Sequence, residues 1–210
     1  MSKVRFNPIV ESFQSAMGNL VYLDYEGEPF VRRKVIPSNP NTEAQRSVRD
    51  AFAMLSGDWK NLGRIIKAAW TASARKSRKK RMRGLAAFIG ANARRQREGE
   101  PLELCRELGE EPLSSFAAAP GSAAGSIDCS FTRPPSGEGK HLTLFVQKKE
   151  NGHAGGDLTR ISLDAAQKSP YTLSNLEGGA SYYVYAILTD KAYEEACTVS
   201  ASSSALSTAK

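Results

Sequence analysis

The side chains best suited to chemistry in this sequence are cations. Seven of the nine residues from position 75 to position 83 are basic, and they are Arg75, Lys76, Arg78, Lys79, Lys80, Arg81 and Arg83. Successive residues of a helix are about 100° apart, so a helix here would spread its charges around the whole axis and could not be buried. Cations at this density also neutralise phosphates and release counterions. The stretch is therefore a solvated helix end, an exposed loop or a contact for a polyanion.

Three further arginines, Arg94, Arg95 and Arg97, lie near the end of a predicted helix that resumes at Leu85. Cations suit the negative pole at the C-terminus of a helix. We count them with the basic stretch as a candidate nucleic-acid or polyanion contact. Ala and Gly dominate the exposed side of that helix before Asn92. Their side chains cannot form hydrogen bonds with base edges, so sequence-specific recognition is disfavoured.

Catalytic motifs are missing from the sequence. It has no G-x-S-x-G, H-E-x-x-H, P-loop or G-x-G-x-x-G pattern, and its only histidines are His141 and His153. The three cysteines, Cys105, Cys129 and Cys197, have no C-x-x-C spacing. We therefore predict no enzyme activity, no catalytic residue, no metal site, no cofactor and no small-molecule substrate.

An alternating apolar pattern near the N-terminus predicts strands that could pair between molecules. Glu26-Gly27-Glu28-Pro29 reads as the turn of a hairpin, and Gly18-Asn19 is a second turn signal. So short a ribbon has little core of its own, which makes it a candidate assembly arm. The assembly residues are Leu20, Val21, Tyr22, Leu23 and Tyr25 before the turn, with Phe30 and Val31 after it.

The elements that follow are predicted to be three helices. Thr42 and Gln45 form a capping-box pattern that starts the first helix, and Gly57 and Asp58 are expected to end it and begin the second. Trp59 and Trp70 would then share one stripe of the second helix. Tryptophan beside Leu and Ile at helical spacing is typical of a core, and the alternative is a stacking platform for bases.

Charge divides the chain into two halves. Residues 1–100 hold 20 Lys and Arg against 9 Asp and Glu, a net charge of +11, whereas residues 101–210 carry 9 against 13, a net charge of −4. This asymmetry predicts a basic domain over residues 1–100, a linker over residues 101–112 and a second domain over residues 113–210. A basic half and an acidic half fit a nucleic-acid-binding protein, and equally a protein whose copies associate head to tail.

The second domain is predicted to be an antiparallel β-sandwich. Short strand-like runs occur at 127–132, 141–148, 158–163, 182–188 and 198–202, with turn residues between them. Leu176-Glu177-Gly178-Gly179-Ala180-Ser181-Tyr182 resembles the L-x-P-G-T-x-Y corner of fibronectin type III domains, with Gly in place of Pro. An immunoglobulin-type bridge needs a cysteine two residues after that tyrosine, where Val184 stands, so Cys129 and Cys197 are expected to be buried free thiols.

Several separate motifs follow one another across residues 8–100. They are a Gly-Asn-Leu-Val-Tyr strand, the basic run Val31-Arg32-Arg33-Lys34, Pro37-x-Asn39-Pro40-Asn41-Thr42-x-Ala44-Gln45, helices with Trp59 and Trp70, and Phe88-Ile89-x-x-Asn92. This order resembles an uncharacterised bacterial family found in phage and prophage settings. The resemblance implies a β-sandwich after the helices and no enzyme activity.

Together these features predict an α+β chain with an N-terminal β-hairpin, a three-helix basic domain and a fibronectin type III-like sandwich. We expect a structural component of a virion or particle, made in the cytoplasm, that associates with itself or with other particle proteins. The alternatives are a non-specific nucleic-acid-binding protein and a subunit of a bacterial surface filament. No signal peptide or membrane-spanning run is expected, because no stretch of 18 apolar residues occurs.

Overall fold

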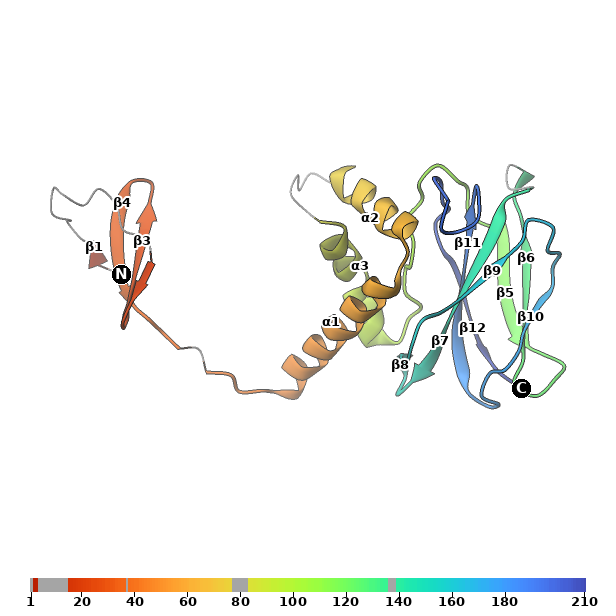
Figure 1. Ribbon diagram of the computed structural model, residues 1–210. Helices are drawn as coiled ribbons and strands as arrows, with labels where there is room; N and C mark the ends of the chain where they lie inside the picture. Colours follow the sequence, from red (N-terminus) through yellow and green to blue (C-terminus); the bar gives the residue numbers. More distant parts are fainter. Residues whose placement is uncertain (1, 4–14, 37, 77–82, 136–138) are drawn as a thin grey trace. The chain divides into compact units, whose positions relative to one another are not determined.

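The structure is a computed structural model that describes residues 2–3, 15–36, 38–76, 83–135 and 139–210 (Figure 1). Its contacts divide the chain into two compact units, Met1–Thr42 and Glu43–Lys210. The chain is α+β. We describe each unit by itself.

The first unit contains an antiparallel sheet with the strand order β1-β4-β3-β2. Its strands are β1 (Ser2–Lys3), β2 (Ser15–Met17), β3 (Leu20–Tyr25) and β4 (Glu28–Arg33). A two-residue loop joins β3 to β4, and both of its residues, Glu26 and Gly27, have positive φ values of 54° and 85°. Such loops match the twist of a hairpin. The Asp24 carboxylate accepts a hydrogen bond from the Gly27 amide at 2.8 Å, which holds the turn.

The second unit begins with three helices, α1 (Glu43–Asn61), α2 (Arg64–Lys76) and α3 (Gly84–Glu98). The predicted break at Gly57 and Asp58 is wrong, because α1 continues through both residues to Asn61. The chain turns at Gly63 instead. The Gly63 amide donates to the Tyr193 hydroxyl at 2.9 Å, and a Cβ atom at Gly63 would lie 2.5 Å from the tyrosine ring. A distant tyrosine therefore fixes the position of this turn.

Two antiparallel sheets follow and form a β-sandwich. One sheet has the order β10-β6-β5, and the other runs β12-β11-β7 with β9 paired to the free side of β7. The bounds are β5 (Ser115–Pro120), β6 (Ile127–Thr132), β7 (His141–Glu150), β8 (His153–Ala154), β9 (Thr159–Leu163), β10 (Tyr171–Leu173), β11 (Ser181–Thr189) and β12 (Ser203–Thr208). The Tyr182 hydroxyl accepts from the Glu177 amide at 3.0 Å, which is the tyrosine corner of such sandwiches.

The last strand begins later in the chain than the predicted run at 198–202. Residues 198–202 contain only an isolated bridge at Val199, and β12 begins at Ser203. The small-residue stretch from Ala117 to Ser126 is partly strand, since β5 includes residues as far as Pro120. Its remainder joins the first two strands of the sandwich.

Strand β11 is buried on both of its faces. Val184, Ala186 and Leu188 pack with the core between the two sheets, whereas Tyr183, Tyr185 and Ile187 pack with residues of all three helices. The second unit therefore has three layers, with the helices on one side of the β12-β11-β7-β9 sheet and the β10-β6-β5 sheet on the other (Figure 1).

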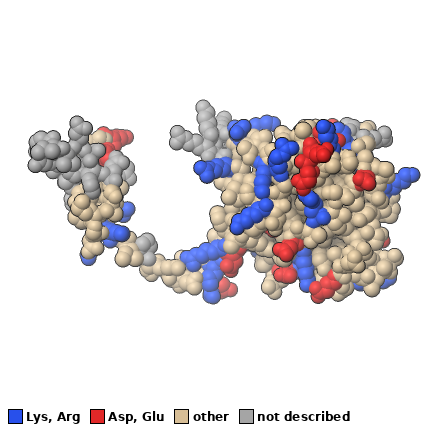
Figure 2. Space-filling model, viewed as in Figure 1, with Lys and Arg blue, Asp and Glu red and all other residues tan. Residues whose placement is uncertain are grey.

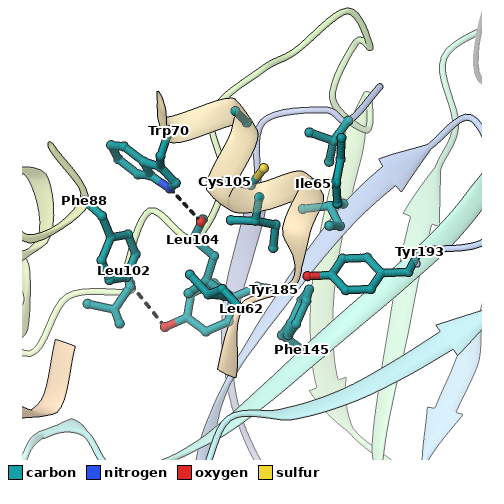
Figure 3. Close-up of a cluster of buried hydrophobic side chains, with 14 of the residues drawn as sticks. Leu62, Ile65, Trp70, Phe88, Leu102, Leu104, Cys105, Phe145, Tyr185 and Tyr193 are labelled. Carbon is teal, nitrogen blue, oxygen red and sulfur yellow. Dashed lines mark hydrogen bonds between the residues drawn. The ribbon is translucent and has the colours of Figure 1, made fainter. Parts of the chain in front are cut away.

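The predicted linker over residues 101–112 differs from the structure. Leu102, Leu104 and Cys105 are buried in the core that the helices share with β11 (Figure 3). The Trp70 indole donates to the Leu104 carbonyl at 2.9 Å, and the Leu102 amide donates to the Tyr185 hydroxyl at 3.1 Å. We call residues 99–105 the seam. Because the seam fills the space between helices and sheet, the boundary between units falls after Thr42 and not near residue 100.

Candidate functional site

The residues proposed for assembly lie together in the N-terminal sheet. Leu20, Val21, Tyr22, Leu23 and Tyr25 belong to β3, and Phe30 and Val31 belong to β4. The register places Tyr22 opposite Val31 and Leu23 opposite Phe30. Neighbouring residues of a strand point to opposite faces, so each face of the sheet carries one of these apolar pairs.

This sheet does not bury its own apolar side chains. Every side chain described within Met1–Thr42 is exposed or only partly buried, and Met17 and Leu20 are among the exposed ones. Burial of apolar surface is the main force that holds a small sheet together. A sheet that is apolar on both faces with no buried centre is a surface that another chain could cover.

The basic residues divide into two groups. Arg75 and Lys76 end α2 and Arg83 precedes α3, whereas Arg94, Arg95 and Arg97 lie in the last turns of α3. Since a helix rises 1.5 Å per residue, Arg83 and Arg94 are about 16 Å apart along α3. Arg78, Lys79, Lys80 and Arg81 lie outside the described residues. Arg83 and Arg94 to Arg97 thus lie toward opposite ends of α3.

Acidic partners weaken the second group as a phosphate contact. The Arg94 Nε atom lies 2.8 Å from the Glu98 carboxylate, and Arg95 lies 3.8 Å from that of Glu100. On the face shown in Figure 2, basic side chains over the helices are interspersed with acidic ones. Arg94 and Arg95 are thus partly neutralised.

A cleft of about 420 Å³ opens beside α1, and the sequence did not indicate it. Ala51 and Met54 of α1 and Ala154 of β8 supply apolar lining, while Asp50, Arg97 and Glu150 add charges of both signs. The full lining set is Ser47, Asp50, Ala51, Met54, Gln96, Arg97, Glu150, Asn151, His153, Ala154 and Gly155. These residues come from three distant segments, so no local motif could have revealed the cleft.

The described residues show no grouping of metal ligands, and the two buried thiols are not activated. Among them, no three His, Cys, Asp or Glu side chains are grouped to hold a metal ion. All three cysteines are free, but Cys197 is exposed and not buried as expected. Burial raises the pKa of the Cys129 thiol to about 12 and raises that of Cys105 as well, so neither is a thiolate at neutral pH. Within the described part of the chain, no helix is long and apolar enough to cross a membrane.

Comparison with known proteins connects the sandwich to fibronectin type III-like domains over about half of the chain. A fibronectin type III domain of human collagen alpha-1(XX) is 27% identical, covering 48% of this chain and 87% of that one, with a TM-score of 0.39. A fibronectin type III-like protein from Clostridium thermocellum is 16% identical, covering 48% of this chain and 96% of that one, with a TM-score of 0.34.

A family 76 glycoside hydrolase from a bovine Bacteroides thetaiotaomicron strain is 20% identical, with a TM-score of 0.40. The match covers 47% of this chain but only 20% of the hydrolase, so it gives no indication of activity. No protein-family model and no curated protein matches the sequence, and the phage-associated resemblance gains no support from them.

Proposed function

We propose that this chain is a non-enzymatic structural subunit that self-associates through its N-terminal sheet and displays the helix-backed sandwich. One observation carries the proposal: no described side chain of Met1–Thr42 is buried, although apolar residues occupy both faces of its sheet. The second unit, in contrast, encloses two apolar cores of its own. The sheet therefore needs a cover that the second unit does not.

A second copy of the same sheet fits as that cover. Glu28, Phe30 and Arg32 alternate along β4 and so lie on one face, with the aromatic ring between the two charges. Two copies related by a two-fold axis through Phe30 would bring Arg32 of each copy over Glu28 of the other, which also pairs with Lys3 of its own chain. A surface that is complementary to itself in this way is what a symmetric pair requires.

The assembly state can be measured by size-exclusion chromatography with light scattering, in the presence of nuclease. We expect the full chain to associate and residues 43–210 to remain monomeric. Leu23→Glu should abolish association because it places a charge opposite Phe30. Leu206→Glu is the control, since Leu206 is exposed on β12 in the second unit. A full chain that stays monomeric at every concentration would refute the proposal.

A charge exchange tests the partner more sharply. Glu28→Arg and Arg32→Glu should each weaken association, because each creates like charges across the two-fold axis. The double variant should recover it. If the double variant associates no better than the single ones, the partner of this face is not a second copy in that orientation.

The setting we propose is an assembled particle. The order of motifs across residues 8–100 favours a phage virion, and a filament of the same subunits is the alternative. Electron microscopy of the assemblies would distinguish closed particles from open filaments. A nucleic-acid role has less support, since the described arginines fall into two groups and Arg94 and Arg95 face glutamates. Replacing Lys79, Lys80 and Arg81 with Glu should leave assembly intact and would abolish DNA binding if those residues contact phosphate.

A further inference from the structure

A carboxyl group is buried where the first helix meets the sheet. Asp58 lies in the last turn of α1 with only 5% of its surface exposed, and Gln147 of β7 faces it with 1% exposed. The Gln147 Nε2 atom donates to the Asp58 Oδ1 atom at 3.1 Å. This hydrogen bond joins the helical layer directly to the sheet.

Two acceptor oxygens of this pair have no hydrogen-bond partner among the described residues. They are Asp58 Oδ2 and Gln147 Oε1, and both are inaccessible to solvent. Leaving a buried polar atom without a hydrogen bond is costly, so such atoms call for an explanation. A single proton on Oδ2 could satisfy both, because the resulting hydroxyl would donate to Oε1 while Oδ1 keeps its bond to Nε2. A carboxylic acid and an amide paired in this way exchange two hydrogen bonds.

The surroundings of Asp58 oppose its ionisation. The pKa of this carboxyl is raised to about 6, mainly by burial. The hydrogen bond from Gln147 lowers the pKa, whereas the negative charge of Asp157 raises it further. Its position at the C-terminal end of α1 also places it near the negative pole of the helix. From β11, the neighbouring titratable group is the neutral phenol Tyr185. Among the described residues, no cation contributes to the shift in the pKa of Asp58.

We propose that Asp58 and Gln147 form a proton-dependent latch between α1 and β7, closed when Asp58 is the neutral acid and weakened when it ionises. The latch acts inside the second unit, so it stands independently of the proposed self-association.

The sign of the pH dependence follows from the raised pKa. An acid whose pKa is higher in the folded state than in the unfolded state binds an extra proton on folding, so stability falls as the pH rises through that interval. The latch contributes fully below about pH 4, where unfolded aspartate is also protonated, and its contribution is lost by about pH 7. Across this window the unfolding equilibrium constant should rise roughly a hundredfold through Asp58 alone.

Asp58→Asn is the decisive variant, because an asparagine amide can donate to Gln147 Oε1 at every pH. Trp59 and Trp70 are the only tryptophans and both lie in the helices, so their fluorescence reports unfolding of this unit in the full chain. The ratio of the wild-type to the variant unfolding constant should increase about a hundredfold between pH 4 and pH 7.5. Asp50→Asn, at an exposed position of the same helix, is the matched control and should show no such trend.

A direct titration keeps the test decisive even if the variant fails to fold. The carbon-13 signal of the Asp58 carboxyl in the wild-type chain should titrate near pH 6. Parallel stability curves for wild type and Asp58→Asn, or a carboxyl signal that titrates near pH 4, would overturn the proposal. Either result would mean that Asp58 is ionised in the fold at neutral pH.

Discussion

The N-terminal sheet and the helix-backed sandwich have similar side chains on their strands but differ in how far those side chains are buried. Both contain alternating aliphatic and aromatic residues on strands, such as Tyr22 and Leu23 in β3 and Tyr185 and Ile187 in β11. On β11 these side chains are buried beneath helices supplied by the same chain, whereas in β3 they remain partly exposed. The difference shows that an apolar strand pattern indicates a need for cover but does not tell what supplies it. The cover has to be found elsewhere in the chain or on another molecule.

The largest effect should come from removing a ring from the shared core. Phe88 of α3 is fully buried and makes an edge-on contact with Trp70 at a centroid distance of 5.5 Å. Phe88→Ala should lower the free energy of unfolding by about 3–5 kcal/mol, because it leaves a cavity. The same change at Phe52, which is 55% exposed on α1, should cost less than about 0.5 kcal/mol. Chemical denaturation followed by tryptophan fluorescence would measure both, and equal losses would contradict the layered core.

A smaller effect is expected where polar groups hold the seam against α3. The Asn92 side chain donates to the Glu103 carbonyl at 3.0 Å and accepts from the Glu103 amide at 2.8 Å. Asn92→Ala should cost about 1–3 kcal/mol, since it leaves both backbone groups without a partner. Asn61→Ala, at the exposed end of α1, is the control and should change the same unfolding curve little. If the two variants unfold alike, the seam is not held by this amide.

The backbone at the start of the seam should be sensitive to a single methyl group. Gly99 has a φ of 69°, and a Cβ atom there would lie 2.3 Å from the Gly152 carbonyl oxygen. Gly179 also has a positive φ, of 78°, but a Cβ atom there would meet nothing within 4 Å. Alanine at Gly179 should cost about 1 kcal/mol from backbone strain alone, and alanine at Gly99 should cost clearly more. A thermal melt of the two variants separates backbone strain from steric collision. Equal losses would show that the turn at residues 151–152 yields to the added methyl group.

The smallest effects should come from surface ion pairs, and here the two regions should behave alike. Lys3 pairs with Glu28 in the N-terminal sheet, and Arg94 pairs with Glu98 on α3. All four side chains are at least 41% exposed, so solvent and salt screen the attraction. Lys3→Ala and Arg94→Ala should leave folding unchanged in hydrogen exchange at 0.15 M and 0.5 M salt. This expectation is for the dissociated chain, because the proposed two-fold pairing would cover the Lys3–Glu28 pair. A clear loss at Lys3 in the dissociated chain would contradict it.

The sequence predicts the α+β class and the sandwich because their signals are local. Strand runs, turn residues and the corner at Tyr182 all lie within a few residues of one another. The break between α1 and α2 could not be predicted, since it depends on Tyr193, which is 130 residues from Gly63. The burial of Leu102 and Leu104 has the same origin, because helices and sheet together create the space that they fill.

One signal for the helical cover was present in the sequence. A strand with one face in water alternates apolar and polar residues, but Tyr182 to Leu188 is apolar without interruption. That run indicates a strand buried on both faces. The cleft had no comparable signal, and neither did the pairing of Asp58 with Gln147 across 89 residues.

The seam changes what this sandwich can be used for. In this protein the seam, which leads into the first strand of the sandwich, is held by hydrogen bonds to Trp70, Asn92 and Ser202. Removing the helices would expose Tyr183 and Tyr185 of β11 to solvent. A transplanted sandwich would therefore have to include all three helices.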